Sequence, residues 1–240
     1  MGRVSAEQLK AHRVVSREEW LAERTALLAL EKNFSRQREE LARQRRALPW
    51  VRVEKIYTFE GRNGPASLAD LFASRSQLVV YHFMFKPEAS AGCAHCSFWA
   101  DHYSAAIPHL QHRDVTLVAI SRASLAQIEA FRQRMGWSFN WVSSGGTDFN
   151  YDFQASFSPA QLASGEVFYN YAKSAAGPAD REGISVFYRD DAGNVFHTYS
   201  CYARGIDMVN GTYQFLDLVP RGRDEAPGAA QDWVRYHDRY

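Results

Sequence analysis

The sequence predicts a mixed α/β sheet flanked by helices, with a long helical extension at the N-terminus. Apolar, β-rich runs alternate with amphipathic helical segments in the middle of the chain, and two later strand segments are joined by a hairpin turn. A long helical pattern precedes both of these features. We therefore divide the chain into a helical arm (residues 1–50), an α/β domain (51–220) and a C-terminal tail (221–240) that packs on the domain.

Composition and charge describe an ordinary globular protein. The 240 residues carry 28 Lys and Arg against 27 Asp and Glu, and 46% are apolar, so the chain can bury a core and has no excess charge to attract nucleic acid. The longest apolar run, Leu78 to Phe85, is far shorter than the roughly 20 residues of a membrane span. We expect no membrane and no nucleic-acid partner. The first ten residues lack the apolar stretch of a secretory signal, so we expect a cytoplasmic protein with reduced thiols.

The arm begins with a capping box, because Ser16 can cap the backbone amide of Glu19 while the Glu19 side chain reaches back. The predicted helix runs to Leu48 and ends at Pro49. Its apolar residues recur at every seventh position (Trp20, Leu27, Phe34, Leu41, Leu48), but the second apolar position of a coiled-coil heptad is missing. We expect this helix to pack on its own domain or on a partner subunit of a homo-oligomer.

The elements of the domain follow in order. Strands are expected over 77–85, 114–121 and 140–143, and helices over 93–110, ending near Pro108, and over 124–135, closed by Gly136. Two further strands, 184–189 and 195–202, flank a segment with hairpin turn chemistry at 190–194. A final helix is expected over 205–218. The tail after Pro220 is polar, and we expect it to be loose until Trp233.

The segment that carries chemistry is Cys93-Ala94-His95-Cys96, which follows a buried strand and begins a helix. Two cysteines three positions apart can close a disulfide with little backbone movement, and the free amides of a helix start favour the thiolate of the first. Lowering a thiol pKa from about 8.5 to about 7 raises the thiolate fraction at neutral pH from roughly 3% to roughly 50%. We predict a redox dithiol in which Cys93 attacks and Cys96 resolves, framed by His95 and Trp99. His82, in the preceding strand, is more simply a core histidine and is kept as a candidate supporting contact.

The alternative is a copper or zinc site, because Cys-x-x-Cys is half of a zinc site. No second such pair exists, so Cys201 with His82 or His197 would have to supply the remaining ligands from distant strands. Cys201 is more simply a small buried strand residue. A further alternative is a scaffold that binds without catalysis. The redox interpretation itself needs no metal and no cofactor.

Six motifs spread over nearly the whole chain carry a family resemblance: Val15–Trp20, Leu48–Val53, Cys93–Asp101, Met135–Phe139, Asp148–Phe153 and Trp233–Tyr240. They resemble the thioredoxin-like bacterial family known as domain of unknown function 899 (DUF899). The resemblance implies a thioredoxin-type fold for the domain and a presumed redox dithiol at the two motif cysteines. It implies no substrate.

Two departures from that pattern bear on the substrate. Ala94 stands where the family commonly has proline, and Glu182-Gly183 stand where thioredoxin-like proteins place a cis-proline opposite the dithiol. Either the nearby Pro178 takes this role, or the substrate is small. We expect a thiol–disulfide oxidoreductase with a disulfide or peroxide substrate and a thiol reductant, in which a peroxide would convert the first cysteine to a sulfenic acid.

Overall fold

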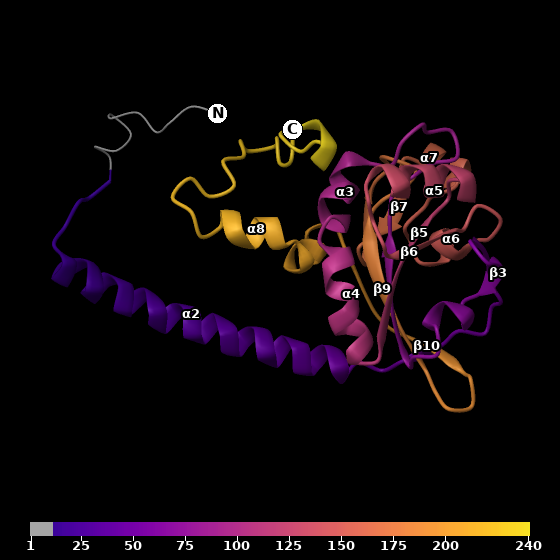
Figure 1. Ribbon diagram of the computed structural model, residues 1–240, viewed down its shortest axis with the longest axis horizontal. Coiled ribbons are helices and arrows are strands. Elements are labelled where there is room, and N and C mark those ends of the chain that lie inside the picture. Colours follow the sequence, from indigo (N-terminus) through magenta and orange to yellow (C-terminus); the bar gives the residue numbers. More distant parts are fainter. Residues whose placement is uncertain (1–11) are drawn as a thin grey trace. The chain divides into compact units, whose positions relative to one another are not determined.

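The computed structural model describes residues 12–240 (Figure 1), so the expectation for the first ten residues lies outside the described part. The chain divides into two compact units, residues 1–48 and 49–240. In the first unit, helix α2 (Arg17–Arg46) begins at the predicted capping box. The Ser16 hydroxyl accepts the Glu19 N–H at 3.2 Å and the Glu19 carboxylate accepts the Ser16 N–H at 3.1 Å. No residue of α2 is buried.

An eight-stranded mixed sheet forms the centre of the second unit (Figure 1), with the strand order β1-β10-β9-β4-β5-β6-β2-β3. The bounds are β1 (Val51–Arg52), β2 (Thr58–Gly61), β3 (Gly64–Ser67), β4 (Gln77–His82), β5 (Val115–Ser121), β6 (Asn140–Ser143), β9 (Gly183–Arg189) and β10 (Val195–Tyr202). Strands β4, β5 and β6 are parallel, and β9 pairs with β4 in the antiparallel sense. The five strands expected from the sequence are confirmed. The strands β1, β2 and β3 extend the sheet at its two edges, and β7 (Glu166–Tyr169) pairs with β8 (Ala172–Ala175) in a separate hairpin.

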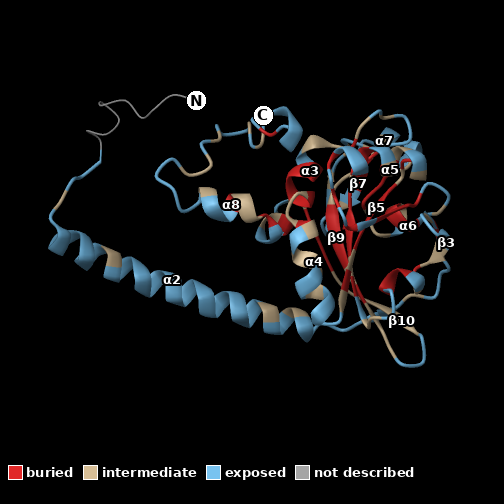
Figure 2. Ribbon diagram, in the orientation of Figure 1, coloured by how far each residue is buried: buried red, intermediate tan, exposed pale blue. Residues whose placement is uncertain are grey.

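Helices flank both faces of the sheet, but unequally. Helices α3 (Ala94–Ala100), α4 (Tyr103–His112) and α5 (Leu125–Arg134) contribute buried side chains to one core cluster. Both crossovers, β4 to β5 and β5 to β6, step along the sheet in the same direction, and right-handed crossovers then place their helices on the same face. The opposite cluster is closed by the short helices η1 (Asp70–Phe72) and α6 (Phe149–Asp152). Buried residues concentrate along the sheet and on the inner surface of α3 (Figure 2).

Two predicted helices are interrupted. The expected helix over 93–110 consists of α3 and α4, with a break at Asp101, whose carboxylate accepts the Trp137 indole N–H at 2.8 Å and pairs with His237 at 2.6 Å. Helix α4 continues past Pro108 to His112. The expected helix over 205–218 consists of η2 (Ala203–Val209) and α8 (Gly211–Leu216). They are separated by the buried Asn210, whose side chain caps the second piece.

The tail packs on the rest of the second unit already before Trp233, so the expectation that it is loose up to that residue is wrong: the Tyr213 hydroxyl donates to the Glu225 carboxylate at 3.0 Å. The Val234 side chain is buried, and the Trp233 ring lies 5.3 Å from the ring of Phe98 in α3. The Tyr236 hydroxyl donates to the carbonyl of Gly92 at 2.7 Å, directly before the first motif cysteine. The tail ends in a short helix, η3 (His237–Arg239). Over residues 12–240, no helix has the length and apolar character needed to cross a membrane.

Candidate active site

The backbone around Cys93 is fixed from both sides. Cys93 is the N-cap residue of α3 in an extended conformation, with φ −60° and ψ 132°. Its N–H donates to the Met84 carbonyl at 3.0 Å, and its own carbonyl accepts the N–H of Ser97 at 3.0 Å and the Ser97 hydroxyl at 2.9 Å. The loop after β4 and the first turn of α3 therefore hold the Cys93 backbone in place.

The pKa of the Cys93 thiol is lowered to about 7. The largest cause is a hydrogen bond from the Cys96 thiol, and the backbone N–H groups of Cys96 and His95 add to the lowering. Burial and the Glu182 carboxylate act in the opposite direction. Hydrogen bonds to a thiolate favour the charged form, so the start of α3 stabilises a nucleophile at neutral pH.

Cys96 differs from Cys93 in both burial and pKa. Its side chain is 1% exposed, and its pKa is raised well above the ordinary value, first by burial and then by the neighbouring Cys93. The Met84 N–H donates to the Cys96 sulfur at 3.4 Å. Cys93, in contrast, is partly exposed, and both cysteines are free thiols. The start of α3 thus carries a partly exposed thiol of lowered pKa and a buried thiol of raised pKa three positions apart.

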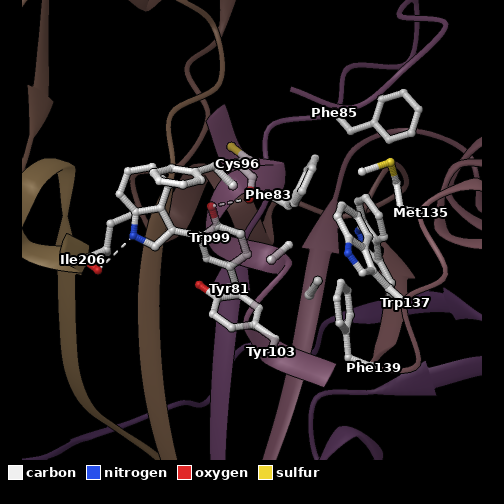
Figure 3. Packing of buried hydrophobic residues seen from close by; sticks show 14 of the residues in the cluster. Tyr81, Phe83, Phe85, Cys96, Trp99, Tyr103, Met135, Trp137, Phe139 and Ile206 are labelled. Carbon is white, nitrogen blue, oxygen red and sulfur yellow. Dashed lines mark hydrogen bonds between the residues drawn. The ribbon is translucent and has the colours of Figure 1, made fainter. Parts of the chain in front are cut away.

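The wall behind Cys96 is aromatic (Figure 3). The Tyr81 hydroxyl donates to the Cys96 carbonyl at 3.3 Å, and the Trp99 indole N–H donates to the Ile206 carbonyl at 3.0 Å. Trp99 is buried in the same core cluster as Cys96. Cys201 lies in the same cluster on β10, 9% exposed, as expected for a small buried strand residue.

The other two predicted residues are placed differently. The His95 side chain is exposed to solvent, and what His95 gives to the site is its backbone N–H. His82 lies on the opposite face of β4, where its ring stacks on Phe149 at 5.6 Å, so the expectation that it supports the dithiol is wrong. Side chains alternate between the two faces of a strand, and Tyr81 occupies the dithiol face. His82 is the core histidine that the simpler interpretation predicted.

The histidines proposed as remote metal ligands are engaged elsewhere. His82 is hydrogen-bonded to the Ser185 hydroxyl at 2.9 Å and His197 to the Ser200 hydroxyl at 2.7 Å, and the two serines are themselves bonded at 2.8 Å. This chain of polar groups lies on the sheet face away from the dithiol. In the described part of the molecule, no cluster of three or more His, Cys, Asp or Glu side chains is arranged to hold a metal ion.

Two residues without a predicted role also reach the site. The negative charge of Glu182, directly before β9, raises the pKa of both thiols. The charge of Cys93 in turn helps to raise the pKa of Tyr236 in the tail, although burial is the larger cause. Glu182 stands in the segment that departs from the thioredoxin-like pattern, and Tyr236 stands in one of the six motifs. Neither residue has a local sequence signal for its role. The peptide bond before Pro178 is trans, as are the other described peptide bonds, so Pro178 does not supply the missing cis-proline.

A dithiol at the start of the helix after β4, on a mixed sheet flanked by helices, defines a thioredoxin-like α/β protein. More closely, the chain belongs to the family described as bacterial protein of unknown function (DUF899), whose model matches residues 9–240. No match to a curated protein was found.

Solved structures similar to this chain include peroxiredoxins. Peroxiredoxin Q of Xanthomonas campestris, in a cysteine-to-serine mutant form, is 15% identical with a TM-score of 0.43, covering 66% of this chain and 90% of that one. Peroxidoxin BcpB of Mycobacterium tuberculosis is 13% identical with a TM-score of 0.43, covering 69% and 95%. The yeast mitochondrial 1-Cys peroxiredoxin is 11% identical with a TM-score of 0.41, covering 68% and 75%.

The low pKa of Cys93 predicts how its reactivity depends on pH. Because only the thiolate attacks an alkylating reagent, the rate at Cys93 should rise from pH 5 to pH 9 with a midpoint near pH 7, since the pKa is about 7. The rate at Cys96 should stay low over the same range. Peptide mass spectrometry after short pulses of iodoacetamide measures both rates. A Cys93 midpoint at or above about 8.5, the value for an unperturbed thiol, contradicts the prediction.

Proposed function

We propose that this protein is a thiol–disulfide oxidoreductase in which Cys93 attacks and Cys96 resolves. The observation that carries the proposal is the placement of the two thiols at the start of α3, where both residues are hydrogen-bonded to the Met84 backbone, with the first thiol partly exposed and the second buried. A substrate can reach only the first sulfur directly. The second sulfur is held where it can attack the first.

The reaction has two displacements. The Cys93 thiolate attacks one sulfur of the substrate disulfide, a new S–S bond forms, and the other substrate sulfur leaves as a thiolate. Cys96 then loses its proton and attacks the Cys93 sulfur, which releases the second substrate thiolate. The two departing thiolates take up protons. The substrate is reduced by two electrons, the protein gains a Cys93–Cys96 disulfide, and a thiol reductant restores the dithiol.

The same two thiols can reduce a peroxide. The Cys93 thiolate attacks one peroxide oxygen, and the O–O bond breaks as the S–O bond of the sulfenic acid forms. The other oxygen leaves as hydroxide or alkoxide and takes up a proton to give water or an alcohol. Cys96 then displaces the sulfenic oxygen as water and closes the same disulfide. The partial burial of Cys93, beside the Gly92 carbonyl that Tyr236 engages, favours a small substrate in either reaction.

The Cys96→Ser variant tests this division of roles. It should accumulate a mixed disulfide between Cys93 and a small disulfide substrate, because no second thiol is left to resolve it. The wild-type protein should instead lose two hydrogen atoms and form the internal disulfide. Intact-protein and peptide mass spectrometry distinguish the two products, and parallel incubations with hydrogen peroxide show whether a sulfenic acid forms.

Three results contradict the proposal. Stoichiometric copper or zinc in protein purified without a chelator, lost in Cys93→Ser or Cys96→Ser, points to the metal site instead. Failure to form either disulfide, with both cysteines dispensable, points to a binding scaffold. A mixed disulfide at Cys96 in the Cys93→Ser variant reverses the assigned roles, and one at Cys201 in the Cys96→Ser variant relocates them.

A further inference from the structure

Glu182 is fixed beside the dithiol by the register of the sheet. Gly183, the first residue of β9, pairs with His82, the last residue of β4, so Glu182 comes level with the segment that begins at Phe83. The next residue, Met84, is hydrogen-bonded to both motif cysteines. The antiparallel pairing of β4 with β9 therefore brings Glu182 to the end of the sheet where the two sulfurs lie.

The backbone at this position has little freedom to move. The Tyr169 hydroxyl donates to the Glu182 carbonyl at 3.0 Å. A Cβ atom at Gly183 would lie 2.4 Å from the buried ring of Tyr202, so the chain packs directly against that ring. Contacts on both sides hold the Glu182 backbone where its carboxylate acts on the thiols.

The charge of Glu182 has no direct partner. Within residues 12–240, its carboxylate makes no ion pair and no hydrogen bond. The neighbouring Arg181 guanidinium lies 4.6 Å over the Tyr169 ring and donates to the Ala175 carbonyl at 3.0 Å. At the tail, Arg134 and Asp238 neutralise each other in an ion pair at 2.9 Å. The carboxylate thus contributes a negative electrostatic potential at the end of the sheet where the two cysteine sulfurs lie.

We infer that Glu182 is a specificity-determining residue that makes the dithiol favour neutral or cationic disulfides over anionic ones. The inference deepens the proposed function and rests on it, because it concerns the substrate of the same two thiols. An anionic substrate must bring its charge close to a carboxylate that is half-buried and therefore incompletely screened by solvent. A neutral or cationic substrate meets no such repulsion.

Alkylation of Cys93 by two reagents of similar shape tests the charge effect. Iodoacetamide is neutral and iodoacetate is anionic, so the ratio of their rates at one thiol reports the local field and cancels any change in thiolate fraction. Relative to a free-thiol reference, Glu182→Gln should raise the relative rate of iodoacetate by about three- to tenfold, and Glu182→Lys should raise it further. The effect should shrink in concentrated salt.

Glu54→Gln is the matched control, because it removes the same charge from an exposed site beside Gly193 and Asn194, at the other end of β9. The seven residues of that strand place it about 20 Å away. The ratio in this variant should equal that of the wild type. An unchanged ratio in both Glu182 variants, with folding confirmed by circular dichroism, overturns the inference, as does an equal change in the control.

Turnover with three small disulfides connects the charge effect to the substrate. Cystamine is cationic, hydroxyethyl disulfide is neutral and glutathione disulfide is anionic. In the wild type kcat/KM should fall in that order. In Glu182→Gln the ratio of kcat/KM for cystamine to kcat/KM for glutathione disulfide should decrease by about three- to tenfold. Absence of turnover with all three overturns the proposed function, and the alkylation ratio still decides the charge effect. An unchanged spread in an active Glu182→Gln enzyme overturns the substrate preference.

Discussion

Replacing Cys93 by serine should lower the rate of disulfide reduction about a thousandfold or more. A serine hydroxyl remains protonated at neutral pH and cannot form the mixed disulfide. The variant therefore cannot carry out the first displacement at all, rather than carrying it out more slowly. The wild-type thiol has a pKa of about 7, so about half of it is already a thiolate at neutral pH. Steady-state reduction of a small disulfide, coupled to a thiol reductant, measures the loss.

Cys201→Ser is the control for this prediction, because it makes the same chemical change at a buried thiol on β10. It should retain turnover within about threefold, with a modest loss of stability from placing a hydroxyl in the core. Residual activity of Cys93→Ser similar to that of the control would remove Cys93 from the reaction.

The central strands were predictable because burial on both faces leaves a signal in the sequence. Strands β4 and β5 lie in the middle of the sheet, so they appear as nearly continuous apolar runs, and β6 matches its predicted bounds, Asn140–Ser143. The β9–β10 hairpin was predictable from its turn, where Gly193 adopts φ +85°. In each case a local pattern of residues determines the element.

The missed strands are short or lie at the edges. Strands β2 and β3 have four residues each, joined through Arg62 and Asn63, and the following Gly64 has φ +103°. The Asn63-Gly64 pair is a turn signal that could have revealed this hairpin. In the β7–β8 hairpin, both Asn170 and Tyr171 have positive φ, and tyrosine is not a residue that predicts such a turn.

The residues of the candidate site also fall into those that a local sequence pattern locates and those that only the fold brings together. The positions of Cys93 and Cys96 at a helix start follow from four consecutive residues, so sequence alone located the dithiol. Glu182 and Tyr236 reach it only through the pairing of β4 with β9 and the packing of the tail, across sequence separations that local patterns do not encode. The face of β4 on which His82 lies depends on strand phase, which an almost wholly apolar strand does not reveal.

The two thiols differ in pKa because their surroundings differ, although only two residues separate them. Cys93 receives hydrogen bonds from the first turn of α3, and Cys96 is enclosed by aromatic side chains. About half of the Cys93 thiol is therefore already a thiolate at neutral pH, while the Cys96 thiol keeps its proton. Once Cys93 is bonded to substrate, its negative charge is gone, and one cause of the raised Cys96 pKa disappears with it. In the reaction we propose, this electrostatic coupling would set the order of the two displacements, with attack by Cys93 before attack by Cys96.

Replacing Asp180 by alanine should lower the free energy of unfolding by about 3–5 kcal/mol. Asp180 is 4% exposed, and one of its carboxylate oxygens accepts from Arg122 at 2.8 Å and from the Ser156 hydroxyl at 2.7 Å. The substitution leaves a largely buried guanidinium without its counter-charge. Urea unfolding followed by fluorescence measures the change. Because Asp180 lies two residues before Glu182, the variant should also alter the iodoacetate to iodoacetamide ratio at Cys93.

A double-mutant cycle separates the ion pair from the rest of the loop. Removing Arg122 as well, as Arg122→Met, should recover part of the loss, because no unpaired charge then remains buried, with a coupling energy of about 1–3 kcal/mol. The matched control is Arg62→Ala, which breaks the more exposed pair with Glu129, at 2.7 Å, and should cost at most about 1 kcal/mol. If Asp180→Ala and Arg62→Ala lowered the free energy of unfolding equally, burial would not make the Arg122–Asp180 pair more stabilising than an exposed pair. The loop before Glu182 would then depend on its backbone bonds, from Phe157 to the Ala179 carbonyl at 2.8 Å and from Arg181 to the Ala155 carbonyl at 2.9 Å.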